Sequence, residues 1–332
     1  GNLFARASAG AGGEIYRLDR HPSISQHPVT PMRESDLRIH LGRQTNFAIG
    51  LFDVLQYSRP AAEQLAKLET LAKDFDIVLF DALEPQHLAQ IGELLDEGAA
   101  PQTPRFSIGS SAVESALGPL WQRRDQLRPA EGWPNVAANS PLLVLSGSCS
   151  PITGTQIAHA AQQGFVEVRV DAAEIFADAA AADRLLAQAG DLCVQGLASG
   201  RSVAVHTSQG NSDPRIASTL QAALDAAPSQ QDDATGVQTH ISATLGRFLG
   251  SLAARCREDA NANRICVAGG DTSSHAARAM GIDALTMIKP YVTGAPLCQV
   301  SAPGCPLDGC QVNFKGGQVG AVDYFTGLAD FS

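Results

Sequence analysis

A turn between an apolar run and a helix has the residues of an anion-binding site. Gly269 and Gly270 follow ICVA and precede HAARAM, and Asp271, Thr272 and Ser273 stand between them. Glycine lets the backbone approach a ligand closely. We expect Thr272 or Ser273 to cap the helix. Because the free amides at a helix start attract anions, usually phosphate, this turn predicts a phosphate site.

A second turn, SGSCS at residues 146–150, has the same arrangement between an apolar run and a helix. Ser150 suits the position that caps the helix, Pro151 the first helical position and Gly164 the stop. In open α/β sheets, ligands bind beyond the carboxyl ends of the strands, where such turns lie. Two turns of this kind in one domain favour a shared ligand. The candidate ligand-binding residues here are Ser146, Gly147, Ser148 and Ser150.

The segment KGGQVG at residues 315–320 is a third candidate part of this site. Lys315 offers a positive charge to a phosphate, and Gly316 and Gly317 permit close backbone approach. The alternative interpretation is a hairpin turn with a solvated lysine.

Asp271 has two interpretations of equal weight. It binds magnesium, directly or through water, or a ribose hydroxyl, or it simply caps the helix. The Walker and Rossmann glycine motifs are absent from the sequence, so any nucleotide site here is of another kind. A serine hydrolase is a weaker alternative, because SGSCS does not meet the G-x-S-x-G pattern.

The stretch YRLDRHPSISQHPVTPM, residues 16–32, is a polar loop with three prolines near the start of the chain. Its basic residues include Arg17, Arg20 and His27. Arginine recognises carboxylates with two parallel hydrogen bonds, so this loop is a candidate binding site for an acid. A surface loop stiffened by proline is the equally weighted alternative.

The elements that must position these residues alternate between strands and helices. Helical periodicity is present at 61–75, 174–190 and 237–256. Continuous apolar runs typical of strands buried on both faces lie at 47–54, 76–83, 105–111, 142–148, 167–170, 202–208, 265–270 and 284–290. This alternation predicts α/β layers with largely parallel sheets.

Two domains fit the length of 332 residues. The polar segment RDQLRPAEGWPNVAANS reads as a linker, so we expect domains at 1–125 and 141–332, joined by 126–140. Each is expected to have three α/β layers with a largely parallel sheet. Short strand-like pieces separated by Gly and Pro near the C-terminus predict hairpins that make the second sheet mixed.

Charge and composition exclude several classes of function. A formal net charge of -10 without a basic cluster argues against nucleic-acid binding, and no apolar run is long enough to cross a bilayer. Cys149, Cys193 and Cys266 lie in apolar or strand-like contexts typical of free thiols. Cys305 and Cys310 are the only close pair, and a metal site there would need further ligands. We therefore expect a cytoplasmic protein with reduced thiols that binds neither nucleic acid nor a membrane. The sequence does not determine its oligomeric state, and it is compatible with a homo-oligomer.

The ordered set RLDRHPSISQHPVTPM, GLFDV, FSIGSS, VLSGSCSPITGTQI, AGGDTSS and FKGGQVG resembles the four-carbon acid sugar kinase family over essentially the whole chain. The resemblance implies an N-terminal domain that binds an acid sugar and a C-terminal domain that binds ATP. It implies magnesium-dependent phosphorylation of threonate, erythronate or keto relatives. The nucleotide-binding residues that it implies are Ser146, Gly147, Ser148, Ser150, Gly269, Gly270, Asp271, Thr272, Ser273, Gly316 and Gly317. We add Lys315 for its charge and Asp271 as the candidate magnesium ligand, from the residue types discussed above.

For the sugar acid, the candidate binding residues are Arg17, Arg20 and His27 of the polar loop and Ser110 and Ser111 of the FSIGSS turn. Relatives begin with an Asp-Asp-x-Thr-Gly-type segment that this sequence lacks, and the acid that receives the hydroxyl proton is expected there. Ala112 stands where relatives are expected to have glycine. A binding module without catalysis is the main alternative function, and a hydrolase using Ser148 the weaker one.

Overall fold

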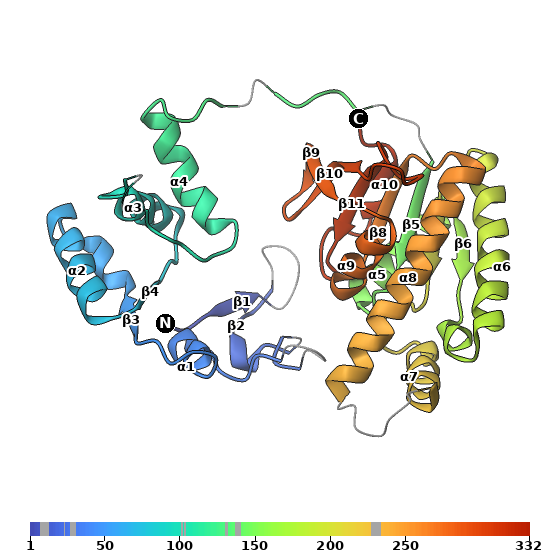
Figure 1. Ribbon diagram of the computed structural model, residues 1–332, viewed down its shortest axis with the longest axis horizontal. Coiled ribbons are helices and arrows are strands. Elements are labelled where there is room, and N and C mark those ends of the chain that lie inside the picture. The colour runs from blue at the N-terminus through green and yellow to red at the C-terminus, as the bar shows by residue number, and fades with distance from the viewer. Residues whose placement is uncertain are drawn as a thin grey trace. The chain divides into compact units, whose positions relative to one another are not determined.

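The computed structural model describes residues 1–6, 13–22, 24–26, 31–100, 102, 104–129, 132–136, 141–226 and 234–332. The chain forms two compact units, one within residues 1–132 and the other from residue 133 to 332 (Figure 1). The division falls inside residues 126–140, the segment expected to be a linker.

A mixed sheet of seven strands is the centre of the second unit, in the order β6-β7-β5-β8-β11-β10-β9. The first five strands in this order run parallel, and β10 is antiparallel to both β11 and β9. The predicted parallel sheet completed by C-terminal hairpins is confirmed. The strands are β5 (Leu142–Ser146), β6 (Val166–Arg169), β7 (Val203–His206), β8 (Arg264–Ala268), β9 (Ala284–Val292), β10 (Ala295–Ser301) and β11 (Gln311–Lys315).

Helices cover both faces of this sheet, which makes three layers (Figure 1). Side chains of β5 alternate between the two cores: Leu143 and Leu145 pack in one, Leu142 and Val144 in the other. This is why the strand reads as a continuous apolar run. The first core is closed by α6 (Ala179–Ala198), α8 (Ala234–Ala260) and α9 (Gly270–Ala279), the second by α5 (Pro151–Gln162) and α10 (Tyr324–Ala329).

Two helices of the second unit have boundaries other than those predicted. The pattern at 174–190 divides into the 3₁₀ turn η3 (Ala172–Phe176) and α6, because Asp178 caps α6 by accepting a hydrogen bond from the Ala181 amide. Helix α8 extends the predicted 237–256 at both ends, and α7 (Pro214–Ala226) was not predicted. Among the helices that the structure describes, none is both long and apolar enough to span a membrane.

The first unit has two small sheets in its described residues. Antiparallel β1 (Phe4–Arg6) and β2 (Ile15–Arg17) form one, and parallel β3 (Ile49–Phe52) and β4 (Ile77–Phe80) form the other. The connection from β3 to β4 includes the helix α2 (Ala61–Asp74). The buried core of this unit lies between the β3–β4 sheet, this helix and the helical segments on either side of it in the chain, and it contains Phe52, Tyr57, Leu68, Leu71, Ile91, Leu94 and Ala116. The helical elements are η1 (Leu18–Arg20), α1 (Leu37–Gly42), η2 (Val54–Ser58), α2 (Ala61–Asp74), α3 (Pro85–Asp96) and α4 (Ala112–Arg123).

The first unit differs from the expected three-layer domain. Its parallel sheet has only two strands in the described residues, and the strand predicted at 105–111 is not formed. Phe106 and Ile108 are 90% and 88% exposed. A strand requires a neighbour for its backbone hydrogen bonds, and this segment is not paired with either of the two described sheets of the unit.

The core of the second unit should be the main source of its stability. Leu249→Ala in α8 removes a side chain that is fully buried, so we expect a loss of about 2–5 kcal/mol in the free energy of unfolding. Leu192→Ala in α6 is the control, because Leu192 is 51% exposed. Urea unfolding followed by circular dichroism measures both, and equal losses would contradict this assignment of the core.

Candidate functional site

The three predicted turns follow neighbouring parallel strands and meet at one edge of the sheet. Ser146 at the end of β5 pairs with Ala268 of β8, and Ala268 pairs with Lys315 of β11. Backbone hydrogen bonds continue beyond the strands. The Gly147 amide donates to the Ala268 carbonyl over 3.1 Å, and the Gly269 amide to the Lys315 carbonyl over 3.0 Å. The sheet therefore places all three turns together.

The contacts between these turns require glycine. A Cβ atom on Gly147 would lie 2.5 Å from Thr272 Oγ1, and one on Gly317 would lie 2.6 Å from Ser148 Oγ. Gly269 has φ +124°, a conformation that other residues rarely adopt. The glycines thus allow the turns to pack against one another. The sequence analysis had expected them to allow close approach of the backbone to a ligand instead.

Helix α9 begins earlier than predicted, at Gly270, so Thr272 and Ser273 are not its caps. Gly269 holds the cap position because its positive φ turns the chain into the helix three residues before Thr272 and four before Ser273. The first helical hydrogen bond runs from the Ser273 amide to the Gly269 carbonyl. The amides of residues 270–272 precede that bond and are available to an anion.

Helix α5 presents a second set of free amides. Ser150 holds the cap position and Pro151 the first helical position, as predicted. The Gly154 amide makes the first helical bond, to the Ser150 carbonyl. Ser150 Oγ does not cap the helix: it is a buried oxygen without a hydrogen-bond partner in the described part of the chain. Because buried polar atoms are nearly always paired, this hydroxyl fits a site that is completed by a ligand.

Lys315 is not the solvated lysine of the alternative interpretation. It is 1% exposed, and its Nζ donates a hydrogen bond to Thr153 Oγ1 over 2.9 Å. The Thr153 hydroxyl in turn donates to the Gly317 carbonyl, over 2.8 Å. The rings of Tyr324 and Phe325 lie 5.4 and 5.6 Å from Nζ. Burial lowers the pKa of Lys315 to about 8.

Asp271 does not cap α9, which excludes one of its two interpretations. It is exposed in the first turn of the helix. The described residues contain no cluster of three or more His, Cys, Asp or Glu that would hold a metal by themselves. Magnesium usually binds through one or two carboxylates together with substrate phosphates, so the exposed Asp271 beside the candidate phosphate site fits that pattern.

Comparison with known proteins decides the family. A family model described as a nucleotide-binding C-terminal domain matches residues 143–325, and one described as a sugar-binding N-terminal domain matches residues 1–117. This chain belongs to the four-carbon acid sugar kinase family. It is 38% identical over 330 residues to a 3-oxo-isoapionate kinase of Paraburkholderia graminis, covering 98% of this chain and 66% of that protein. It is 30% identical over 332 residues to a 3-oxo-tetronate kinase of Methylobacterium radiotolerans, covering 98% and 68%.

The fold agrees with solved structures. A Salmonella typhimurium LT2 protein aligns with a TM-score of 0.65 at 22% identity, over 94% of this chain and 66% of its own. A Haemophilus influenzae protein of a domain-of-unknown-function family aligns with a TM-score of 0.61 at 18% identity, over 95% and 68%. The chain spans about two thirds of the length of the curated family members that it matches.

A fourth turn lies beside the three predicted ones at the same edge of the sheet, and the sequence analysis missed it. After β7, the Thr207 amide donates to the Ser146 carbonyl, and Ser208 Oγ donates to the Ser148 carbonyl over 3.1 Å. The sequence carried a signal, because HTSQGNSDP has the same order of strand, hydroxyl- and glycine-rich turn, and proline at the first helical position.

The candidate acid-binding residues of the first unit have varied surroundings. Arg17 forms an ion pair with Asp19, and hydrogen bonds from Arg17 lower the Asp19 pKa. Arg20 is exposed at the end of η1. Ser111 holds the cap position of α4 without a side-chain hydrogen bond, and the Ser110 carbonyl accepts the Val113 amide. His27 lies outside the described residues.

The cysteines depart from the prediction at one position. All seven are free thiols, so Cys305 and Cys310 form no disulfide. Cys305 donates to the Met280 carbonyl and Cys310 to the Ala262 carbonyl. Cys149 is exposed rather than packed as a small hydrophobic residue, because it lies in the SGSCS turn beyond the end of β5.

The hydrolase alternative gains no support from the geometry. Ser148 Oγ accepts the Ser150 amide over 3.2 Å. The buried imidazole of His206 is hydrogen-bonded to Glu167 and Arg215 instead of to a serine.

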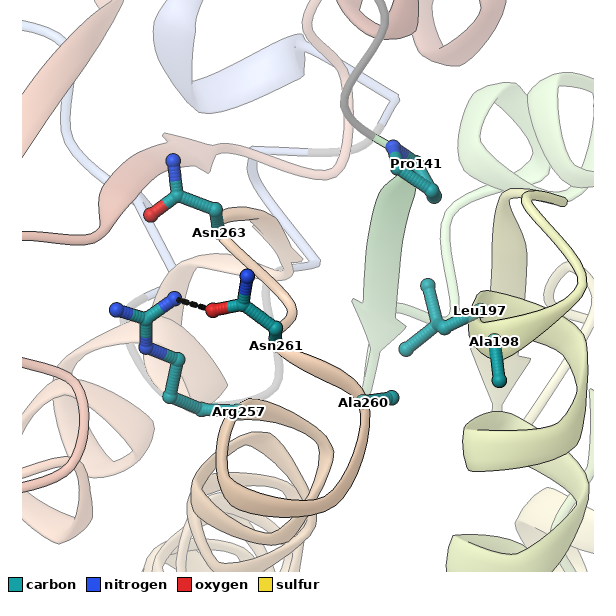
Figure 2. Close-up of a pocket in the computed structure, with 7 residues that line it drawn as sticks. All are labelled: Pro141, Leu197, Ala198, Arg257, Ala260, Asn261 and Asn263. Carbon is teal, nitrogen blue, oxygen red and sulfur yellow. Dashed lines mark hydrogen bonds between the residues drawn. The ribbon is translucent and has the colours of Figure 1, made fainter.

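A hollow of about 550 Å³ lies at the opposite edge of the sheet, beside the starts of β5 and β8 (Figure 2). Arg257 lines it and donates to Asn261 Oδ1 over 2.6 Å and to the Pro306 carbonyl over 3.3 Å. Ligands of open α/β sheets bind at the carboxyl ends of the strands, so this hollow is a poor candidate for the nucleotide.

Gly147→Ala tests the close approach of the turns. The added methyl would displace Thr272, and we expect a loss of about 1–3 kcal/mol in the free energy of unfolding. Gly270→Ala is the matched control, because its Cβ would meet nothing within 4 Å. Urea unfolding of both variants measures the difference, and an unchanged Gly147→Ala protein would contradict the packing.

Lys315→Met should stabilise the protein at pH 7, because it removes a buried charge. A pKa lowered from 10.5 to about 8 corresponds to a cost of about 3 kcal/mol, so we expect a gain below that value. The unfolded wild type binds more protons than the folded one between about pH 8 and 10.5, so its stability should rise with pH across that window. The gain of the variant should shrink over the same window. Urea unfolding at several pH values checks this, and a variant less stable at every pH would contradict it.

Proposed function

We propose that this chain carries the substrate-binding parts of an ATP-dependent kinase that phosphorylates a hydroxyl of a four-carbon sugar acid or its 3-oxo relative. In this proposal residues 141–332 bind the nucleotide, residues 1–125 bind the acid and residues 126–140 link them. The observation that carries the proposal is the meeting of three glycine-dependent turns and two helix starts at one edge of the sheet. Family membership supports it.

The amides at the starts of α5 and α9 are the groups that we assign to the phosphates of ATP. These amides lie at the same edge of the sheet because β5 and β8 are neighbouring strands, and each strand is followed directly by its helix. Ser150 Oγ, which lacks a protein partner in the described residues, completes this set as a donor. The proposed nucleotide site consists of Ser146, Gly147, Ser148, Ser150, Gly269, Gly270, Asp271, Thr272, Ser273, Gly316 and Gly317.

In this proposal the buried ammonium group of Lys315 contributes positive charge to the phosphate-binding site from the interior side of the turn. None of the ion pairs of the described residues includes it, and its hydrogen bond goes to an uncharged hydroxyl. A buried cation without an anion is unfavourable, and a bound polyphosphate beside Gly316 and Gly317 would offset that cost. Thr153 links the ammonium group to the Gly317 carbonyl, so the charge also holds the turn against α5.

Magnesium, when bound, neutralises phosphate charge, and Asp271 is the residue that would hold it. Such catalysis depends on positioning and charge neutralisation, for which the turns are suited. On the acid side we assign Arg17, Arg20, His27, Ser110 and Ser111. Arg20 is the exposed arginine of the described part of this group, whereas Arg17 is engaged by Asp19.

The relatives guide the choice of acid. The two named above are kinases of 3-oxo-isoapionate and 3-oxo-tetronate, so we propose a 3-oxo sugar acid as the first substrate to assay. The free thiols fit a reduced compartment, and we propose the cytoplasm.

The test is ATP-dependent phosphorylation of 3-oxo sugar acids together with calorimetric binding of ADP, with and without magnesium. Gly270→Val should abolish ADP binding without loss of stability, because its side chain would enter open space beside the α9 amides. Gly118→Val is the matched control, since Gly118 of α4 in the first unit also has open space at its Cβ position.

Each outcome separates the alternatives. ADP binding without turnover would favour a binding module, and substrate cleavage without nucleotide would favour a hydrolase. Unchanged ADP affinity in Gly270→Val would remove the nucleotide from the α9 turn.

A further inference from the structure

Ionisable side chains form a continuous hydrogen-bonded series that runs from β6 through the end of β7 to the start of α7. Glu167 Oε1 lies 3.0 Å from His206 Nε2, and Arg215 Nη2 lies 3.1 Å from His206 Nδ1. Arg215 also donates to both carboxylate oxygens of Asp213, over 3.1 and 2.6 Å. Arg169 donates to Glu167 at the other end. None of these residues belongs to the nucleotide-binding set assigned above.

The imidazole of His206 is fully buried at the centre of this chain. Arginine only donates hydrogen bonds, so Nδ1 must accept from Arg215, which leaves the proton on Nε2 to be donated to Glu167. The ring is therefore neutral. Burial lowers the pKa of His206, against the opposing hydrogen bond to Glu167, in agreement with that state.

The chain of side chains ends on the turn after β7. Asp213 Oδ2 accepts the Gln209 amide over 2.8 Å, and Arg215 Nη1 donates to the carbonyls of His206 and Val170. Both ends of the segment 207–213 are thus fixed by one guanidinium–carboxylate pair.

The same turn is packed against the candidate nucleotide site. Ser208 Oγ donates to the Ser148 carbonyl, and a Cβ on Gly154 would lie 3.0 Å from backbone atoms of Gln209 and Gly210. Gly154 lies in the first turn of α5, so the segment 207–213 braces both the SGSCS turn and the start of that helix.

We propose that Arg215 and His206 are positioning residues for the nucleotide site, because they hold the segment 207–213 against the SGSCS turn and so set the direction of the α5 amides. Neither residue needs to touch the nucleotide. The inference rests on the proposed nucleotide site and adds to it a support outside the three turns.

The experiment measures ADP affinity by calorimetry and stability by urea unfolding on the full chain. Arg215→Gln should weaken ADP binding about tenfold, because small displacements of binding groups have effects of that order or larger. Arg201→Gln is the matched control: Arg201 also donates two hydrogen bonds to a backbone carbonyl, that of Gly164 at the far end of α5. Its ADP affinity should stay unchanged whatever its stability.

His206 provides the conservative rescue. His206→Gln retains an acceptor and a donor and should bind ADP within about threefold of wild type, whereas His206→Leu retains neither and should lose about tenfold. Wild-type ADP affinity in a folded Arg215→Gln protein would overturn the inference. Equal losses in Arg215→Gln and Arg201→Gln would also overturn it, because they would indicate a general loss of stability. Absence of ADP binding in the wild type would instead refute the proposed function itself.

Discussion

The close approach of turns at the carboxyl ends of β5, β8 and β11 is the constraint on which the candidate site depends. Gly147 lies against Thr272, and Gly317 lies against Ser148, at distances that leave no room for a side chain. Because β5 and β8 are neighbouring parallel strands, the starts of α5 and α9 lie at one edge of the sheet, and the glycines let the turns pack against each other there. Two sets of free amides then converge, where a single helix start would offer only one.

This arrangement carries an electrostatic cost that the protein retains. Lys315 is buried beneath the turns, and its partners are a threonine hydroxyl and two aromatic rings. Aromatic rings attract a cation weakly compared with a carboxylate. An unneutralised buried charge lowers the stability of the folded protein, but in the proposed nucleotide site it would raise the affinity of the neighbouring turn for phosphate. Stability and binding therefore oppose each other at this residue.

Two sets of contacts hold the backbone of the candidate site in place. The turn glycines set the distance between backbone segments, and the segment 207–213 braces the SGSCS turn from the side of β7. Buried ionic chains such as Glu167–His206–Arg215–Asp213 give geometric definition at a desolvation cost. Their position beside the candidate nucleotide site fits a role in orienting the backbone of that site. Apolar packing would give the same stability without the desolvation cost.

The sequence by itself determined the α/β class, the strands of the second unit and the residues of the three turns. Those features depend on local patterns: continuous apolar runs for buried strands, and Gly with Ser or Thr where a strand enters a helix. Only the tertiary structure decided how each residue is used. Whether Lys315 is solvated depends on Thr153 of α5, which is 162 residues away in the sequence, and on how α10 packs. The start of α9 depends on the φ angle of Gly269, and the fate of 105–111 depends on whether a neighbouring strand is present. Contacts that the fold brings about are not encoded in any local pattern, which is the physical reason that the sequence indicated the residues of the turns but not the contacts that support them.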